Sequence, residues 1–418
     1  MQNIRILAYS DSLLPKFNTG YLKFYKNIVS KLEKDYTIEL IWVGTMGGIK
    51  SGNFINGQYL YNIFSFTDGK DLLEKIKPDI LILTDQQEYC QRSMLIMSKK
   101  LKIPSVVLFS YQPDSFQYSK IYSIKNRLMM LRGRTKEDWP TTRSIIWKKL
   151  TFLKNTINNN KSFVTTQIDL AKILYNSMTR VNSQFYSDFA DLYLCNNEMW
   201  ITEGKKHQIN PSKIKIVGEL TLDDTFMEIS NITRTQKNST KILLITTADA
   251  EHRRISFLEK NELLIKILSK IKNKFPESDL IIKIHPTAEE LDNYKEIISK
   301  TNNSVKVFQK ENLIKLITDS KIVIGVGDTT ALYNVILMKK PLIMIDYLKE
   351  KSFFVKEGIA KTCTIEELDL VINSDKDLDM SNLDNFIKKR FYMFDGRCSE
   401  RAYLHIKNII ELKRKKKY

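Results

Sequence analysis

Short apolar runs alternate with helical patterns along both halves of the chain. The runs are almost wholly apolar, as expected for parallel strands that helices cover on both faces. The alternation of strand and helix predicts doubly wound α/β domains. The expected strands are Ile4–Ala8, Ile38–Val43, Ile80–Leu83, Ser105–Phe109, Ala190–Cys195 and Ile214–Val217, then Ile242–Thr246, Leu280–Ile284, Val305–Val307, Ile322–Gly325 and Leu342–Ile345. The expected helices are Tyr21–Leu32, Asp71–Ile76, Leu95–Leu101, Glu259–Phe275, Ala288–Thr301, Leu313–Thr318 and Thr330–Met338, with a last one near Ser399–Leu412.

The alternation stops between residues 113 and 165, which are helix-like, aromatic and basic, with eleven Lys/Arg against three Asp/Glu. The polar stretch "ISNITRTQKNST" (Ile229–Thr240) has no periodicity and is the best candidate for a linker. A length of 418 residues favours two domains. We therefore expect a Rossmann-like domain over residues 1–228 with a helical basic insertion at about 113–190, a second Rossmann-like domain over residues 229–395, and a C-terminal helix and basic tail over residues 396–418.

The composition, 43% apolar and 27% charged, is that of a globular protein, but the formal net charge of +18 is high. Such a charge favours an anionic partner, which could be a membrane surface, a nucleic acid or a phosphorylated substrate. The four cysteines form no CxxC pair, which argues against a zinc site and a disulfide framework. The N-terminus has no signal-peptide pattern, and no run reaches about 18 apolar residues. We expect a cytoplasmic protein.

Ligands of open α/β sheets bind outside the carboxyl ends of the strands, so polar residues that follow a strand are candidates for a site. The first such stretch in the second half is "TTADAEHRR" (Thr246–Arg254). Arginines at a helix N-terminus suit a phosphate, because free N–H groups and positive charge point the same way. A solvated loop capped by Asp249 is the alternative. The candidates here for contact with a phosphorylated donor are Thr246, Thr247, Arg253 and Arg254.

The second stretch is "LIIKIHPTAEEL" (Leu280–Leu291). Pro286 cannot continue a central strand, and Thr287 can cap the following helix, so His285 is expected at the carboxyl edge of the sheet. An imidazole there can bond a phosphate leaving group or transfer a proton near neutral pH. A histidine that merely satisfies a backbone carbonyl is the alternative, but the position favours a functional role for His285 and Pro286.

The third stretch is "GVGDTTALYNVILMKKPLIMIDY" (Gly325–Tyr347). Gly325 and Gly327 would let a ligand approach the backbone, and the hydroxyls that follow would cap a helix. The GxG pair alone is weak evidence, because it lacks the third glycine of a dinucleotide fingerprint. Combined with His285 and the arginines, it predicts a cradle for a nucleotide phosphate that includes Gly327, Asp328, Thr329 and Thr330.

Two Rossmann-like halves, an "HP" pair after a C-terminal strand, and a hydroxyl-bearing loop followed by a helix and "KKPLI" resemble GT-B glycosyltransferases. The likeness is to the group that contains bacterial polysialyltransferases, capsule Kdo transferases and CDP-glycerol glycerophosphotransferases. It covers roughly residues 190–412, and "FYMFDGRCSERAYLHI" (Phe391–Ile406) is similar to the C-terminal "DGxxSxR" run of the last of these. Asp395 and Ser399 match that run, although a helix cap explains them equally well.

This resemblance implies two domains that face a central cleft and a donor phosphate in contact with His285. It also implies that Thr329 and Thr330 stand where the group has paired serine or threonine. The donors of the group are cytidine nucleotides, so a CMP- or CDP-linked donor is favoured, with a UDP-linked donor as the alternative. Asn334 stands where a carboxylate is expected, which leaves the donor open. No DxD follows a suitable strand, and positive side chains and helix dipoles can neutralise a leaving group, so we expect no metal.

In the first half, "SDSLLPKFNTGYLKF" (Ser10–Phe24) resembles the first loop of GT-B sugar transferases, where a Thr-Gly pair lies under the donor; Thr19 and Gly20 match. An inverting transfer needs a general base for the acceptor hydroxyl. Of the carboxylates at strand ends, Asp11 and Asp85 are the candidates, ahead of Glu88. Each of them could instead serve only as a turn or cap residue.

Aromatic residues lie among the cations of segment 113–165, a mixture that suits anionic lipid headgroups or a lipid-linked acceptor. The basic tail, residues 413–417, is a second such element. The same mixture could stack on nucleic acid, but no recognition motif for nucleic acid is found, which makes that partner less favoured.

The sequence therefore predicts a metal-independent glycosyltransferase of surface-polysaccharide biosynthesis, cytoplasmic and peripheral on the membrane. It would move a sugar or polyol phosphate from a nucleotide-activated donor, such as a CMP-activated acidic sugar, to a glycan, glycolipid or glycoprotein. One alternative is a nucleotide-sugar epimerase of similar two-domain shape. The other is a non-catalytic protein that binds an anionic membrane or nucleic acid.

Overall fold

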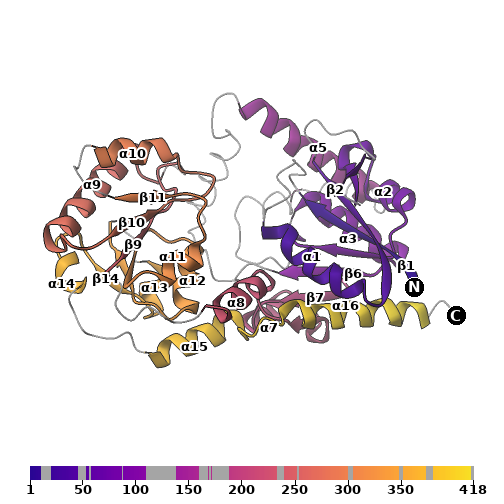
Figure 1. Ribbon diagram of the computed structural model, residues 1–418. Coiled ribbons are helices and arrows are strands. Elements are labelled where there is room, and N and C mark those ends of the chain that lie inside the picture. Colours follow the sequence, from indigo (N-terminus) through magenta and orange to yellow (C-terminus); the bar gives the residue numbers. More distant parts are fainter. Residues whose placement is uncertain are drawn as a thin grey trace. The chain divides into compact units, whose positions relative to one another are not determined.

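The computed structural model describes residues 1–10, 20–45, 53–55, 58–86, 88–109, 138–159, 168, 171, 188–232, 240–251, 254–299, 305–347, 352–372 and 380–415. These residues form two compact units (Figure 1). The first unit combines Met1–Asp223 with Arg390–Tyr418, and the second is Asp224–Lys389. The C-terminal segment, which the sequence analysis set apart, thus packs with the first unit.

The first unit contains an eight-stranded sheet in the order β3-β4-β2-β1-β5-β6-β7-β8. Its strands pair in parallel except for β3 and β4, which are antiparallel. All six strands expected in this half are found, and the short strands β3, at the edge of the sheet, and β4, next to it, are additional. The strands are β1 (Gln2–Ser10), β2 (Tyr36–Gly44), β3 (Asn53–Ile55), β4 (Gln58–Asn62), β5 (Ile80–Leu83), β6 (Ser105–Phe109), β7 (Leu192–Cys195) and β8 (Ile214–Ile216).

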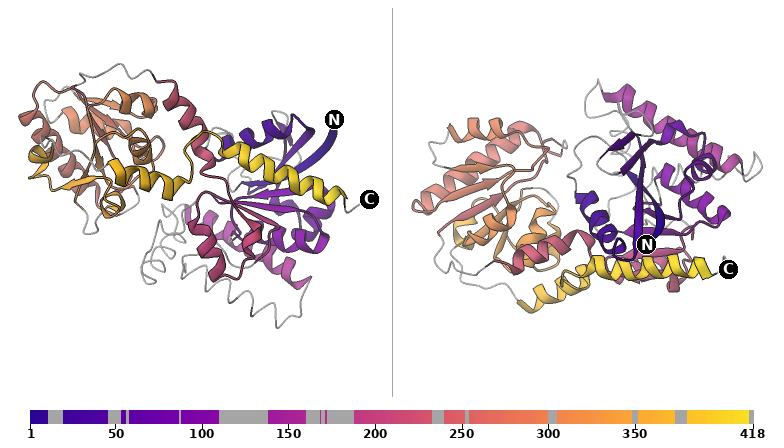
Figure 2. Two further views of the ribbon diagram at one scale, coloured as in Figure 1. Left: turned by 90° about the horizontal axis from the view of Figure 1, so that it is seen from below. Right: turned by 45° about the vertical axis from the view of Figure 1, so that its right-hand side comes forward.

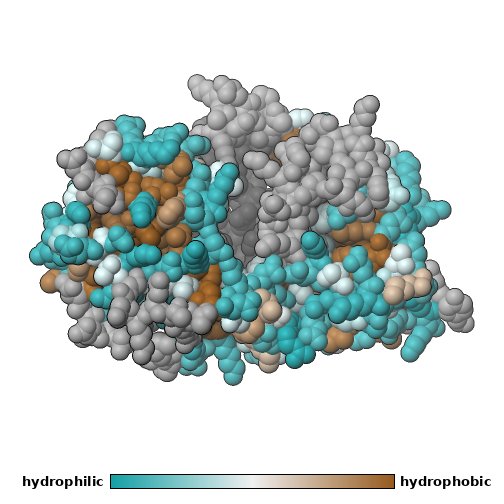
Figure 3. Space-filling model, in the orientation of Figure 1, coloured by the Kyte–Doolittle hydropathy of each residue, from teal (hydrophilic) through white to brown (hydrophobic). Residues whose placement is uncertain are grey.

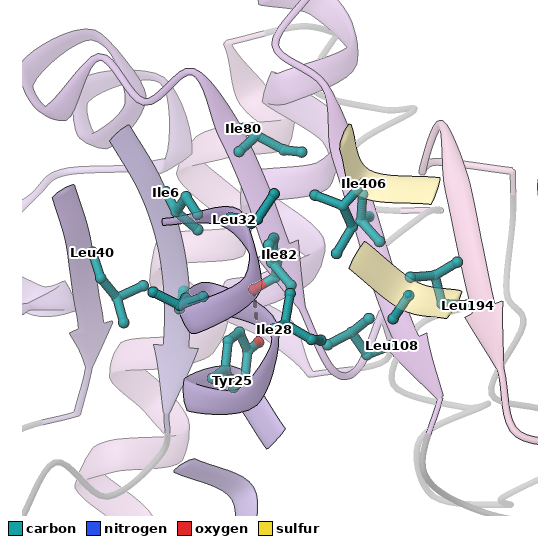
Figure 4. Packing of buried hydrophobic residues seen from close by; sticks show 14 of the residues in the cluster. Ile6, Tyr25, Ile28, Leu32, Leu40, Ile80, Ile82, Leu108, Leu194 and Ile406 are labelled. Atoms are coloured by element: carbon teal, nitrogen blue, oxygen red, sulfur yellow. Dashed lines mark hydrogen bonds between the residues drawn. The ribbon is translucent and has the colours of Figure 1, made fainter. Parts of the chain in front are cut away.

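Helices cover both faces of this sheet, which explains why its central strands are mostly apolar. Successive residues of β1 alternate between the two cores: Ile6 packs with Ile28 and Ile406 on one face, while Leu7 packs on the other. Figure 4 shows the first of these cores, in which the buried Tyr25 hydroxyl donates to the backbone oxygen of Ile82 at 2.7 Å. The first face carries α1 (Gly20–Leu32) and α16 (Cys398–Lys415), and the second carries α2 (Gly69–Ile76), α3 (Tyr89–Leu101), α5 (Asp138–Asn158) and α7 (Met199–Lys206).

The second unit contains a six-stranded, fully parallel sheet in the order β11-β10-β9-β12-β13-β14. Parallel strands bring their carboxyl ends to one edge, so the loops after β10, β9, β12 and β13 are neighbours there. The strands are β9 (Ile242–Ile245), β10 (Leu280–Lys283), β11 (Lys306–Phe308), β12 (Ile322–Val326), β13 (Leu342–Ile345) and β14 (Lys361–Cys363). The helices are α8 (Asp223–Ser230), α9 (Phe257–Lys274), α10 (Leu291–Ser299), α11 (Leu313–Thr318), α12 (Ala331–Leu337), α13 (Phe353–Lys356), α14 (Leu368–Ile372) and α15 (Met380–Phe391).

Local capping decides where two helices of this unit begin. α9 starts at Phe257 because Ser256 and Glu259 form a capping box, each side chain bonding the other's backbone N–H. α10 begins at Leu291, three residues later than expected, and residues 286–288 form a separate turn instead. The expectation that Thr287 caps this helix is therefore wrong.

The C-terminal segment is fixed to the first unit at the start of α16. The carboxylate of Asp223 accepts the backbone N–H groups of Cys398 (2.8 Å) and Ser399 (2.7 Å), which satisfies the free donors of the helix N-terminus. Arg401 donates two hydrogen bonds to Asp395 (2.7 and 3.1 Å) and one to the backbone oxygen of Val217 (2.8 Å). In Figure 3 the described surface along α16 is mostly hydrophilic.

Most of the expected basic insertion lies outside the described residues, apart from residues 138–159, which contain α5, and residues 168, 171 and 188–190. The described part of the chain holds no helix that is both long and apolar enough to cross a lipid bilayer.

Candidate functional site

The loop after β10 holds His285 by a reciprocal set of hydrogen bonds. The backbone N–H of His285 donates to Oε2 of Glu289 at 2.5 Å. In return, Nδ1 of the imidazole accepts the backbone N–H groups of Thr287 (3.3 Å) and Ala288 (3.1 Å). Because Nδ1 is an acceptor, the neutral ring carries its proton on Nε2. His285 is half-buried, and because its Nδ1 accepts backbone N–H groups, the N–H donor of the neutral ring is at Nε2.

Glu289 is the buried centre of this loop, with 1% of its surface exposed. Its Oε2 also accepts the hydroxyl of Thr246 at 2.8 Å. Its Oε1 accepts Nζ of Lys260 (2.6 Å) and the hydroxyl of Tyr294 (2.5 Å). Four protein donors thus stabilise one buried carboxylate.

The loop after β9 is built on a second buried carboxylate, that of Asp249, which is 2% exposed. Asp249 accepts the hydroxyls of Thr247 (2.5 Å) and Tyr347, and Nη1 of Arg254 at 3.0 Å. Burial, together with the neighbouring Asp249 charge, raises the pKa of Tyr347 far above its ordinary value, so its hydroxyl stays protonated as a donor. The side chain of Arg254 is 38% exposed, so its guanidinium, which the bond to Asp249 holds, lies at the surface of this loop.

The loop after β12 packs against that cluster at Gly327. A Cβ at this position would lie 2.5 Å from Oδ2 of Asp249 and 2.6 Å from Oγ1 of Thr247, and the φ of +82° also favours glycine. The side of Gly327 that was expected to face a ligand is therefore filled by the protein's own atoms. Asp328 accepts from Ser352 (2.6 Å) and from the backbone N–H of Phe353 (2.8 Å), so it caps α13.

Thr329 and Thr330 immediately precede α12, with Thr330 as its N-cap, and the backbone N–H of Ala331 lies 3.4 Å from the Thr329 hydroxyl. The Thr330 side chain makes no capping bond and is exposed. Pro286 is also exposed, beside His285.

Sequence reasoning thus placed a group of residues at one sheet edge, and the structure brings them to the carboxyl ends of adjacent strands. The hydroxyls of Thr246 and Thr247, however, serve buried carboxylates and are not turned to a ligand. Arg253 lies outside the described residues. The side chains that sequence reasoning missed are Lys260, Glu289, Tyr294 and Tyr347. Glu289 had one signal, its spacing of four residues from His285.

In the first unit, Asp85 follows β5 and is half-buried. Its backbone N–H (3.1 Å) and that of Thr84 (2.9 Å) donate to the side chain of Gln91. Glu88 is the N-cap of α3, where it accepts the Gln91 N–H at 2.7 Å, and it pairs with Lys149 of α5 at 3.1 Å. The cap alternative therefore holds for Glu88. Asp11 and Thr19 lie outside the described residues, and Gly20 is the first residue of α1.

A further acid of the first unit, Glu219, was not anticipated. It follows β8, is 8% exposed, and accepts from Nδ2 of Asn196 (3.0 Å) and the hydroxyl of Thr221 (3.0 Å). Burial raises its pKa above the ordinary value despite these two donors. Within the described ranges, no three or more His, Cys, Asp or Glu side chains are grouped so that they could hold a metal ion.

No family model and no curated protein sequence matches this chain. Solved structures do. The UDP-GlcNAc 2-epimerase from Methanocaldococcus jannaschii superposes with a TM-score of 0.53 at 15% identity, covering 97% of this chain and 100% of that one. A putative UDP-N-acetylglucosamine 2-epimerase from Listeria monocytogenes gives 0.52 at 12% identity, covering 98% and 97%. The glycotransferase of kitacinnamycin gives 0.50 at 10% identity, covering 97% and 98%. At such identities the likeness shows the fold alone: the chain has the two-unit α/β fold, GT-B, that glycosyltransferases and UDP-GlcNAc 2-epimerases share.

Proposed function

We propose that this protein is a metal-independent glycosyltransferase that binds the phosphate of a nucleotide-activated donor at the carboxyl edge of the second unit's sheet. The observation that carries the proposal is the imidazole of His285, held with Nδ1 as an acceptor and its proton therefore on Nε2. An N–H donor that is oriented in advance at this edge suits a phosphate leaving group, on which negative charge develops.

The chemistry follows from charge. When the sugar–phosphate bond breaks, negative charge grows on the leaving phosphate, and donors that are already oriented stabilise it without further reorganisation. Nε2–H of His285 supplies one such donor. Arg254 supplies a positive charge one strand away, with one of its N–H groups bonded to Asp249. Arg253, Pro286, Thr329 and Thr330 remain candidates for contact with the donor, and Asp85 and Asp11 remain candidates for the general base.

The resemblance of the sequence favours a cytidine-linked donor, such as a CMP-activated acidic sugar, and an acceptor that is a surface glycan, glycolipid or glycoprotein. A UDP-linked donor is the alternative, because proteins of this fold include UDP-GlcNAc 2-epimerases. A peripheral position on an anionic membrane accords with the net charge of +18.

A nucleotide-sugar epimerase is the second candidate, since two of the similar structures bear that name. It would convert its nucleotide sugar without any acceptor. Reaction with the donor alone separates the two: an epimerase forms an isomeric nucleotide sugar, whereas a transferase releases free nucleotide only when an acceptor is present.

Binding of free nucleotides tests the proposal first. The full chain is titrated with CMP, CDP, UMP, UDP and GDP by calorimetry, beside His285→Asn. The asparagine oxygen takes the place of Nδ1 and can still accept from Thr287 and Ala288, but the Nε2 donor is lost. We expect one nucleotide to bind the natural protein and His285→Asn to bind it at least about tenfold more weakly, as when a bond to a charged group is removed. If none of the five binds, the non-catalytic alternative gains support and both enzyme proposals fail.

Turnover with the donor so identified is the second test. His285→Ala should lower it by about 100-fold or more, the usual range for a positioned acid or charge-stabilising group. Near-normal turnover in this variant would remove His285 from the mechanism.

A further inference from the structure

Lys260 joins the two loops that carry the candidate site. It lies on α9, is 6% exposed, and donates to Glu289 at 2.6 Å and to both oxygens of Glu251 at 2.9 Å. Glu251 belongs to the loop after β9, which also carries Arg254, and Glu289 belongs to the loop of His285. One buried ammonium group therefore bridges the two loops.

The turn of His285 is closed from both sides. The side chain of His285 caps the backbone N–H groups of Thr287 and Ala288, while the side chain of Glu289 accepts the backbone N–H of His285. This reciprocity is that of a capping box, applied to a single turn. The second oxygen of Glu289 is fixed by Lys260 and by Tyr294, whose ring also lies 5.6 Å from the lysine nitrogen.

We propose that Glu289, held in place by Lys260, is the positioning residue of His285 and fixes its imidazole as the Nε2–H tautomer. This inference deepens the proposed function and rests on it. A buried ion pair adds little stability compared with apolar side chains of similar size, because desolvation offsets the attraction. Its consequence here is orientation: both loops that would bind the phosphate are tied to one charge.

Glu289→Gln breaks this arrangement with almost no change of volume. The backbone N–H of His285 and the ammonium of Lys260 contact different oxygens of Glu289, and both can only donate. Whichever way the glutamine amide is turned, its NH₂ group therefore faces a donor. We expect the turn to open, so that Nδ1 no longer has fixed partners.

Nitrogen NMR spectra of the histidine side chains in the nucleotide-free protein measure the tautomer of His285 directly. Only four histidines are present, so His285 can be assigned by its loss in His285→Asn. We expect a single Nε2–H tautomer in the natural protein and a mixture of tautomers in Glu289→Gln. An Nδ1–H tautomer in the natural protein, or an unchanged spectrum in Glu289→Gln, would overturn the inference. Because no ligand is needed, this result stands apart from the fate of the proposed function, which fails if the natural protein binds no nucleotide.

A double-mutant cycle then asks whether Glu289 acts through His285. Glu289→Gln alone should weaken nucleotide binding about tenfold, as for an unsatisfied buried donor. In the His285→Asn background it should weaken binding much less, because the donor that it positions is already absent. Equal losses in both backgrounds would mean a general structural effect and would overturn the inference.

Three further variants control for misfolding. Tyr294→Phe removes one donor to Glu289 and should weaken binding about threefold while the protein stays folded. Lys260→Met should weaken binding about tenfold, whereas Lys340→Met should not change it. Lys340 is a half-buried lysine of the same unit whose nitrogen donates to the backbone oxygens of Thr318 (3.0 Å) and Ser320 (2.8 Å), away from the site. Equal weakening by the two lysine variants would contradict the bridge.

Discussion

Glu219 is a carboxyl group whose ionisation opposes folding. Burial raises its pKa above the ordinary 4.5, so the native state binds the proton more tightly than the unfolded chain does. The contribution of Glu219 to stability therefore falls as pH rises from about 4.5 through the raised pKa. Glutamine has the same shape: its oxygen can accept from Asn196 and its NH₂ can donate to the Thr221 hydroxyl, so that only the long bond from the Thr221 backbone N–H (3.5 Å) is lost.

Glu219→Gln should therefore increase the free energy of unfolding at pH 7 by about 1 kcal/mol, since it removes the desolvation of a buried charge. Urea denaturation between pH 4 and 8 measures this, and the gain should shrink towards pH 4, where the natural glutamate is protonated. A variant that is less stable than the natural protein by the same amount at every pH would show that the carboxylate is required in its charged form.

At the residue scale, the sequence predicted which side chains reach the edge of the second sheet but not what they do there. His285 and Asp249 could be placed because a strand ends just before each. The direction of the Thr246 hydroxyl could not be predicted, because it depends on Glu289, which belongs to another loop. The space beside Gly327 likewise depends on Asp249, 78 positions earlier in the chain. Hydrogen bonds between loops are tertiary facts that local pattern does not contain.

Among the elements, α16 is fixed by an ion pair that responds to acid. The hydrogen bond from Arg401 lowers the pKa of Asp395 below its ordinary value, so the ionised form is favoured in the folded state. The resulting stability is fully present above the ordinary pKa of 3.8 and is lost as pH falls through the lowered pKa.

Asp395→Asn should therefore lower the free energy of unfolding at pH 7 by about 0.5–1 kcal/mol, allowing for the partial exposure of the pair, and its deficit should disappear in acid. Thermal unfolding between pH 2.5 and 7 tests this. Asp384→Asn, which removes the exposed pair of Asp384 with Lys339, is the matched control and should change little. Identical behaviour of the two variants would show that the Asp395–Arg401 pair does not fix α16.

The elements themselves were largely predictable, because both sheets are buried and their strands are continuous apolar runs. The strands that were missed, β3, β4 and β14, are three to five residues long and more polar; β3 and β14 are edge strands, and β4 is next to the edge. The start of α10 was wrong because the side chains of His285 and Glu289 close a turn of their own. Such a turn competes with the helix for the same backbone donors.

For the whole molecule, the sequence predicted two α/β units but assigned the C-terminal segment to neither. A chain that returns to its first unit after completing a second leaves no local signal in composition or periodicity. The structure also separates the two basic elements of the first unit. Packing places α5 against the core with α2 and α3, and α16 against the opposite core with α1. Figures 1 and 2 show α5 and α16 on opposite sides of this sheet. A flat membrane can therefore contact one of these helices along its outer face, but not both at once.

We expect the α5 side to be the one that contacts an anionic membrane, because it combines charge with an exposed aromatic. Trp147 is 60% exposed and is followed by Lys148, with Lys154 exposed two turns further on. Interfacial tryptophan next to lysine suits the headgroup region of a bilayer. Replacing Lys148 and Lys154 by glutamate makes the net charge more negative by four units. Because each unit of charge near such a surface is worth about 1 kcal/mol, binding to vesicles with anionic lipid should weaken by at least about tenfold.

Co-sedimentation with vesicles of anionic or of neutral lipid, at low and high salt, measures this. The matched control reverses Lys272 and Lys295, two exposed lysines of the second unit, and keeps the same net charge as the α5 variant. A second control reverses Lys413 and Lys415 at the end of α16. If binding is carried by the α5 side, only the first variant loses it, because screening confines the attraction to charges within about 10 Å of the lipid. Equal losses in all three variants would mean that the lipid responds to the total charge of +18 and not to a surface of this protein.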